Sequence, residues 1–269
     1  MWGSQRLWYR SAIVCGCAVF ALACTAMPAN AEESSQRSEW ALTAGVKLWE
    51  TTWESWIVVP TVFNRASRDV VETINSSTEL AAIPQASVRY GNWLVSASGL
   101  ISTGYTLKPS WGGSLAASRN EIDGNVGYYL LPGLALTAGY KQIEQKFGGT
   151  YKWHGPTLGL SGTGPLGSGF SVYGSVGVGY MDADLPFADG GGRDSLKANY
   201  YLGEAGIAYS IGSIGKLARS LNVTLGYRSQ TLTTKGYGLA DTNTSPPVIN
   251  RQDVHDTTQG ATFSVIAVF

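Results

Sequence analysis

The chain has 269 residues, and its 19 lysines and arginines are balanced by 19 aspartates and glutamates. The formal net charge of zero argues against a nucleic-acid-binding protein. Hydrophobic residues make up 44% of the chain and charged residues only 14%, yet after residue 31 no apolar run approaches the roughly 20 residues that a membrane-spanning helix needs.

The amino terminus has the pattern of an export signal. Arg6 and Arg10 precede an apolar run that is too short for a membrane anchor, and Ala29-Asn30-Ala31 supplies the small residues of a cleavage site. We therefore expect residues 1–31 to be a signal peptide and residues 32–269 to form a single transmembrane domain. All three cysteines lie before the expected cleavage site, so the processed chain would hold neither disulfides nor thiolate metal sites.

Amphipathic segments of about ten residues recur through the rest of the chain, which is the length of a tilted transmembrane strand. Residues 170–181 are the clearest example, because Phe170, Val176 and Val178 would face lipid while Ser175 and Gly177 would face inward. A chain that sits in lipid without membrane helices must close into a β-barrel to pair its backbone groups. In chain order, the predicted strands are residues 40–49, 82–90, 93–105, 121–130, 134–147, 153–162, 170–181, 199–209, 221–232 and 261–269.

Two sets of connections alternate between these segments. The shorter connections are residues 91–92, 132–133, 162–169 and 210–220, and the longer ones are residues 52–79, 107–120, 148–152, 182–198 and 233–257. Short periplasmic turns and longer external loops are typical of outer-membrane barrels. The pattern predicts an all-β fold, a transmembrane antiparallel meander barrel of about ten strands, in which eight or twelve strands also remain possible. A further strand could lie within residues 56–63.

The final segment carries an assembly signal. Phe263, Val265, Ala267 and Phe269 share one apolar face, and this ending resembles the carboxy-terminal sorting strand of bacterial outer-membrane barrels. Together with the signal peptide and the repeated strands, it makes the chain similar to the small outer-membrane barrels of Gram-negative bacteria. That resemblance implies an outer-membrane location, insertion by the barrel-assembly machinery and contact with outer-membrane lipid. It also implies that the longer loops are exposed to extracellular ligands, above all residues 52–79 and 233–257.

Charged side chains of both signs fall on the inward face of the predicted strands. Glu204 and Arg228 come from consecutive strands, as do Asp123 and Lys141, so each pair can meet across a ladder. The interior is therefore either a hydrogen-bonded plug or a narrow polar passage. We predict a lumen charge network made of Lys47, Arg89, Asp123, Lys141, Glu204 and Arg228, with Glu121, Asn125 and Gln230 on the same face.

Two motifs near the outer rim could carry chemistry. Asp182-Ala183-Asp184 and Asp253-Val254-His255 resemble the Asp-x-Asp and Asp-x-His motifs of the omptin proteases, ten-stranded outer-membrane barrels, which implies a water-activating site. In omptins, however, the motifs lie on other loops. The sequence therefore favours a non-enzymatic barrel, either a structural or surface-binding protein or a narrow porin-like passage. A rim enzyme, omptin-like or lipid-modifying, is the alternative.

The acidic loop after the first of these motifs suggests a cation site. Asp182, Asp184, Asp189 and Asp194 surround a run of glycines, and calcium prefers such oxygen ligands. Their spacing does not match the calcium loop of an EF-hand, and a solvated loop is the simpler interpretation. We therefore expect neither a metal nor a cofactor. The second histidine, His154, has lipid-facing parity beside Tyr151 and Trp153 and is expected to be an interfacial residue.

Overall fold

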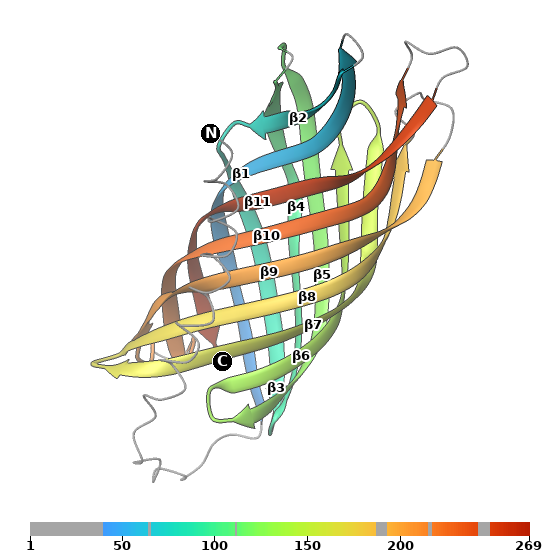
Figure 1. The fold of residues 1–269 in the computed structure, drawn as a ribbon. Helices are drawn as coiled ribbons and strands as arrows, with labels where there is room; N and C mark the ends of the chain where they lie inside the picture. The colour runs from blue at the N-terminus through green and yellow to red at the C-terminus, as the bar shows by residue number, and fades with distance from the viewer. Residues whose placement is uncertain (1–39, 64–65, 111, 187–192, 215–216, 242–247) are drawn as a thin grey trace.

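The computed structural model describes residues 40–63, 66–110, 112–186, 193–214, 217–241 and 248–269, which form a single antiparallel sheet (Figure 1). Its strands are β1 (Trp40–Phe63), β2 (Ala66–Ser76), β3 (Glu79–Tyr90), β4 (Trp93–Pro109), β5 (Leu115–Leu131), β6 (Leu134–Lys146), β7 (Thr150–Gly167), β8 (Phe170–Pro186), β9 (Arg193–Ile211), β10 (Ser220–Asp241) and β11 (Val248–Val268). Within these ranges, no helix has the length and apolar character needed to cross a membrane. The predicted signal peptide lies outside the described residues.

Ten of the strands close into a ring. From β3 to β11 each strand pairs with its neighbours in the chain, and β1 closes the ring by pairing with β3 on one side and β11 on the other. The seam between β1 and β11 runs from Thr43↔Val268 to Ile57↔Val254. This closed meander confirms the predicted fold class, and closure removes the unpaired edges that lipid does not tolerate.

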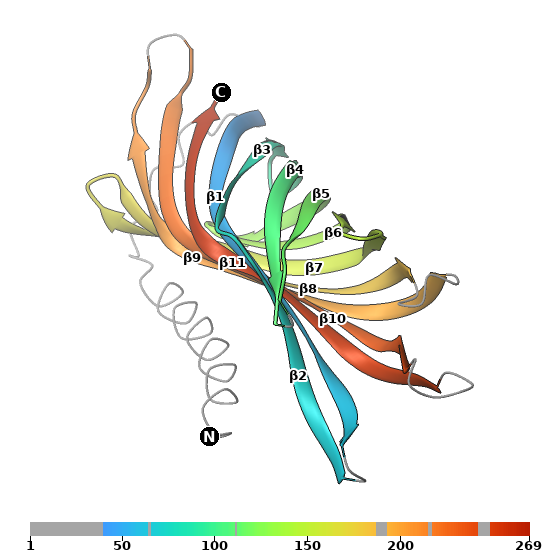
Figure 2. The same cartoon turned by 90° about the horizontal axis from the view of Figure 1, so that it is seen from above.

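β2 stands apart from this ring. It pairs along the outer half of β1 and meets β4 only through its last residues, Ile74 to Ser76. Figure 2 shows β2 and the adjoining end of β1 extending away from the ring. The segment considered as a hidden strand, residues 56–63, is the continuation of β1.

The predicted loops on this outer side were wrong in their extent. Most of residues 52–79 and 233–257 belong to β1, β2, β10 and β11, and the loops predicted at 107–120, 148–152 and 182–198 are likewise shortened by neighbouring strands. Among the shorter connections, residues 162–169 were also placed too early, because β7 continues to Gly167. The prediction relied on apolar and polar side chains alternating, and this alternation ends where the outer surface becomes polar. Backbone pairing does not depend on that contrast and continues.

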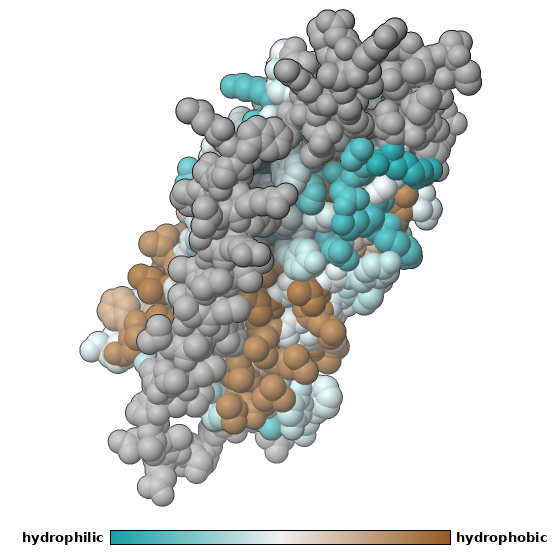
Figure 3. Space-filling view, viewed as in Figure 1, coloured by the Kyte–Doolittle hydropathy of each residue, from teal (hydrophilic) through white to brown (hydrophobic). Residues whose placement is uncertain are grey.

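An apolar band surrounds the half of the barrel that is nearer the short turns. Its members alternate along the strands with buried or half-buried inward residues, and they include Val46, Val88, Val95, Val126, Leu136, Leu158, Val176, Ile207, Leu225 and Val265. Aromatic pairs border the band at the end with the short turns: the ring centroids of Trp40 and Tyr90 are 4.5 Å apart. Figure 3 shows a hydrophobic lower part and a more hydrophilic upper part on the visible face. An apolar belt with aromatic borders is the lipid-facing surface of a membrane barrel.

The terminal strand shows the predicted alternation. Phe263 and Val265 are exposed on the outer surface, whereas Thr262 and Ser264 are buried inside. The backbone N–H of Phe269 donates to the carbonyl of Leu42 on β1, at 2.8 Å. The last residue therefore takes part in the contact that closes the ring.

Candidate functional site in the barrel lumen

Two clusters of charged side chains lie in the lumen, and the first surrounds the carboxylate of Glu204 on β9. Lys47 on β1 donates to both of its oxygens, at 2.6 and 2.8 Å, and Arg228 on β10 donates to it at 3.3 Å. The hydroxyl of Tyr173 adds a contact at 3.4 Å. Arg228 and Glu204 are register partners in adjacent strands, whereas Lys47 reaches Glu204 from β1, beyond β10 and β11.

The second cluster surrounds the carboxylate of Glu121 on β5. Arg119 Nε lies 2.7 Å from its Oε1 and Lys141 Nζ lies 2.9 Å from its Oε2, and the amide of Gln230 also donates to it. Lys141 lies 3.4 Å from Asp123 as well. Two cations from neighbouring strands therefore share one buried carboxylate.

Gln230 and two aromatic rings join the two clusters into one layer. Arg228 Nη2 and the hydroxyl of Tyr200 both donate to Gln230 Oε1, at 3.5 and 3.1 Å. The guanidinium of Arg228 lies 5.2 Å from the ring centroid of Trp49, and Lys141 Nζ lies 5.5 Å from that of Tyr200. Strands β1, β5, β6, β9 and β10 all contribute, so the layer spans the lumen.

This layer is buried, and its exposure differs between its two sides. Arg119 and Lys141 are each 1% exposed, so their charges require the partners that surround them. The side chains of Lys47 and Asp123 keep 13% and 18% exposure. They lie toward the short-turn half of the barrel, where the inward positions are held mainly by small residues of intermediate exposure.

Above the layer, toward the outer end, large side chains fill the interior. Asp256 on β11 accepts hydrogen bonds from the indole of Trp53 and from the amide of Gln145 and is 5% exposed. Trp53 packs edge-on against Tyr105 and Phe147, with ring centroids 5.8 and 5.3 Å apart. A separate apolar cluster on the facing wall contains Ile143, Trp153, Met181, Leu185, Tyr200 and Leu232.

The structure brings most of the predicted network residues together. Lys47, Asp123, Lys141, Glu204 and Arg228 all belong to the central layer. Arg89 does not, because it lies one residue before the end of β3, where its Nε donates to the carbonyl of Gly91 at 2.9 Å.

Two charged members of the lumen were missed. Arg119 falls in the predicted loop 107–120. It lies two residues before Glu121, so on a strand both side chains point to the same inward face. Extending the predicted strand 121–130 towards the amino terminus would have found it. Asp256 directly follows the rim motif Asp253-Val254-His255 and falls in the predicted loop 233–257, but it alternates in step with the buried Thr258 and Thr262 and therefore points inside.

The structure does not join the two rim motifs. Asp182 forms an ion pair with Lys197, and Asp253 forms one with Lys235. Both aspartates lie on the outer face of strands that are separated by β9 and β10. The hydrogen bond from Lys197 lowers the pKa of Asp182, which lies above the apolar band.

The two histidines also face outward. The ring of His255 stacks on Trp56, with centroids 3.8 Å apart, and its Nδ1 lies 3.1 Å from the hydroxyl of Thr233. Burial lowers the pKa of His255, which lies among polar residues beyond the apolar band. His154 Nδ1 lies 2.8 Å from the hydroxyl of Tyr140.

The acidic loop that was weighed as a cation site is described only in part. Asp189 lies outside the described residues, and the side chain of Asp194 is likewise not described. Elsewhere in the described ranges, no three histidine, cysteine, aspartate or glutamate side chains gather in a way that could hold a metal ion.

Solved structures that resemble this chain are outer-membrane proteins, and the first of them shares its fold. The outer membrane protease OmpT from Escherichia coli has a TM-score of 0.54 with 16% identity, over 88% of this chain and 99% of that one. OprG from Pseudomonas aeruginosa gives 0.39 and 14%, over 86% and 97%. The β domain of the Bordetella autotransporter BrkA gives 0.35 and 11%, over 84% and 99%. No protein-family model and no curated protein sequence matches the chain.

The ring, its apolar outer band and its short turns define an integral β-barrel of the bacterial outer membrane. The likeness to OmpT concerns the fold, and function has to be argued from the residues themselves.

Proposed function

We propose that this protein is a closed, non-enzymatic barrel that acts at the cell surface by binding. The single observation that supports this most strongly is the buried charge layer around Glu121 and Glu204, which spans the lumen. Small barrels are filled by their own side chains, and Trp49, Tyr200 and Trp53 add large rings to this filling. The function is then expected at the strand extensions on the outer end, in residues 52–79 and 233–257.

Planar-bilayer recording of the purified protein tests closure. We expect no discrete conductance steps from the wild type, while the double variant Trp49→Ala/Lys141→Ala removes bulk from two sides of the layer and should produce them. A general-diffusion porin reconstituted in the same way serves as the positive control. Regular single-channel steps from the wild type would contradict closure and favour the narrow passage.

The non-catalytic part of the proposal rests on the rim residues. Asp182 and Asp253 are each engaged by a lysine, and His255 stacks on Trp56 on the outer surface. A general base has to reach a substrate together with its partner groups, and these side chains belong to two separate clusters. His255→Ala should leave any peptidase background unchanged. Loss of a robust purified activity in that variant would support the enzymatic alternative.

A further inference from the structure

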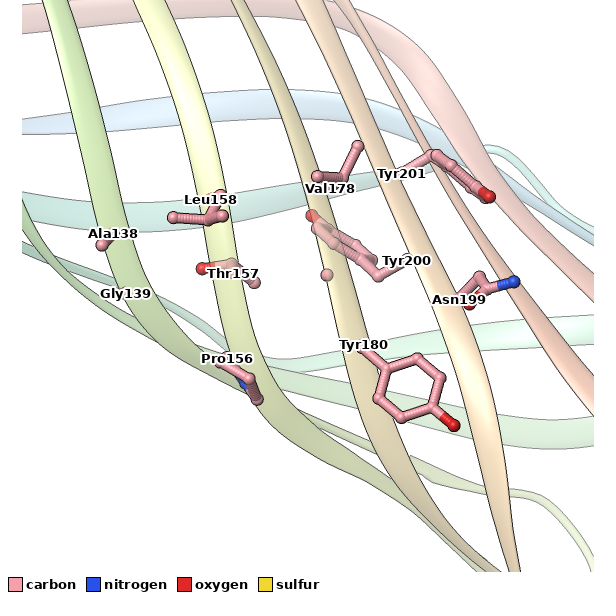
Figure 4. Close-up of a pocket in the computed structure, with 11 residues that line it drawn as sticks. Ala138, Gly139, Pro156, Thr157, Leu158, Val178, Tyr180, Asn199, Tyr200 and Tyr201 are labelled. Atoms are coloured by element: carbon pink, nitrogen blue, oxygen red, sulfur yellow. The ribbon is translucent and has the colours of Figure 1, made fainter.

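A groove of about 670 Å³ crosses the outer wall of the barrel over β6 to β9 (Figure 4). Its outward lining residues are Ala138, Pro156, Leu158, Val178, Tyr180 and Tyr201, together with the polar Asn199. In Figure 4, Leu158 and Val178 lie on neighbouring strands, with Tyr180 and Tyr201 beside them on β8 and β9. The groove is therefore an apolar depression between tyrosine rings on the membrane side of the sheet.

Strand register shows that the groove ends close to the outer border of the apolar band. One row across the wall, Ala138↔Leu158↔Val178↔Tyr201, is apolar apart from one hydroxyl. Four residues farther along each strand toward the outer end, the row Gln142↔His154↔Asp182↔Lys197 is polar and charged. The outer surface thus changes from apolar to ionic just beyond the outer end of the groove.

The backbone pairing between β7 and β8 is interrupted at the groove. Pro156 has no N–H to donate, and the β7–β8 ladder passes from His154↔Asp182 to Thr157↔Gly179 without pairing at the two residues between them. At Gly155 the strands approach so closely that a side-chain Cβ would lie 2.4 Å from the carbonyl oxygen of Tyr180. Ala138 has a short side chain, so the outer surface next to it is recessed.

A cation is held above the groove. Lys197 Nζ lies 5.7 Å from the ring centroid of Tyr180, which is one wall of the groove, and it is paired with Asp182. The Lys197 side chain is 53% exposed. An ammonium has three donors, so it can bind a second oxygen anion while it keeps its carboxylate partner.

We propose that this groove binds an acyl chain of a phosphate-bearing lipid of the outer leaflet, whose phosphate accepts hydrogen bonds from Lys197. The apolar band already faces lipid hydrocarbon, and the groove continues that band up to an exposed cation. Tyr180 and Asn199, which are register partners, add a hydroxyl and an amide between the apolar row and Lys197.

The test uses lipid A as the probe, in micelles of a non-ionic, phosphate-free detergent that contain it or lack it. The readouts are the temperature at which the folded, heat-modifiable gel band unfolds and the amount of lipid A that stays with the extracted protein. Ala138→Trp fills the groove, and its control is Ala86→Trp, another exposed outward alanine, on β3. Lys197→Gln removes the cation, and its control is Lys146→Gln, whose side chain is 56% exposed on the same wall.

Lipid A should raise the unfolding temperature of the wild type and both controls. Ala138→Trp should abolish this shift, and Lys197→Gln should weaken lipid A retention about tenfold, as expected for loss of one charge-assisted hydrogen bond. If Ala138→Trp does not fold, Lys197→Gln alone decides, since it lies beyond the apolar band. Equal shifts in all variants, no shift in the wild type, or an equal shift with inorganic phosphate alone would each overturn the proposal.

Discussion

Lys47 Nζ lies 2.6 Å from Glu204 Oε1, although β10 and β11 separate their strands in the ring. Most contacts in a barrel join adjacent strands, so this ion pair links parts of the wall that the backbone ladder does not join directly. It fixes the distance between β1 and β9 as well as filling the space between them.

Removal of Glu204 should therefore destabilise the barrel. Glu204→Ala leaves the charges of Lys47 and Arg228 without their shared carboxylate, and breaking a buried pair costs about 3–5 kcal/mol. Urea unfolding in lipid vesicles, followed by the heat-modifiable gel shift, measures this loss. Arg89→Ala is the matched control, since Arg89 lies outside the layer, and it should change stability by about 0.5 kcal/mol or less. Equal unfolding free energies of the two variants would show that the Glu204 ion pairs are not buried in the lumen.

Glu121 should be more important than Asp123, its neighbour on the same face. Glu121 binds Arg119, Lys141 and Gln230 and is 5% exposed. Asp123 lies 3.4 Å from Lys141, accepts a hydrogen bond from Asn125 at 2.8 Å and keeps 18% exposure of its side chain. We expect Glu121→Ala to lower the unfolding free energy by at least about 2 kcal/mol more than Asp123→Ala does. Parallel unfolding curves of the two variants measure the difference, and the reverse order would contradict the central position of Glu121.

Phe269 should govern assembly. Its backbone N–H closes the contact with Leu42, and its side chain ends the outward stripe of β11. Deleting Phe269 should lower the amount of folded protein in the outer membrane at high expression. Phe269→Tyr keeps an aromatic terminus and is expected to behave like the wild type. An unchanged folded fraction after the deletion would argue against a sorting function of this strand.

Acid should loosen the outer end of the β1–β11 seam through His255. Burial lowers the pKa of His255 below its ordinary value of 6.5, so on acidification the unfolded chain takes up this proton first. The stabilisation from the neutral ring is complete above pH 6.5 and is lost as the pH falls toward the folded-state pKa. His255→Phe keeps a ring on Trp56 but cannot titrate.

NMR titration of the histidine ring protons gives the pKa directly, and stability measured across the same pH range gives its consequence. The wild type should lose more stability on acidification than His255→Phe. A midpoint for His255 at or above 6.5, or identical pH dependence in both proteins, would contradict this assignment.

The sequence predicted the strands best where they face lipid. In residues 170–181 the bilayer requires apolar residues at alternate positions, and this requirement appears directly in the residue types. Beyond the band, β10 and β11 continue with polar residues on their outer face, so their length could not be found from hydropathy.

The lumen was predictable in part for the same reason. Parity gave the inward position of Glu204 and Arg228, because both lie within clearly alternating strands. Parity could not give the link from Lys47 to Glu204, which depends on the diameter and stagger of the closed ring. It also missed Asp256, since the motif around His255 suggested a rim cluster and hid the alternation of that strand.

The seam that joins β1 to β11 has a consequence for the time course of folding. Thr43 on β1 pairs with Val268 on β11. The ribosome makes β1 first and β11 last, so β1 can complete its pairing only after β11 has been synthesised. Such high contact order makes folding slow, and it leaves a long interval in which the free edge of β1 could pair with another chain. Cellular yield should therefore depend on how well the unfinished chain is kept from its neighbours, even if the finished barrel is very stable.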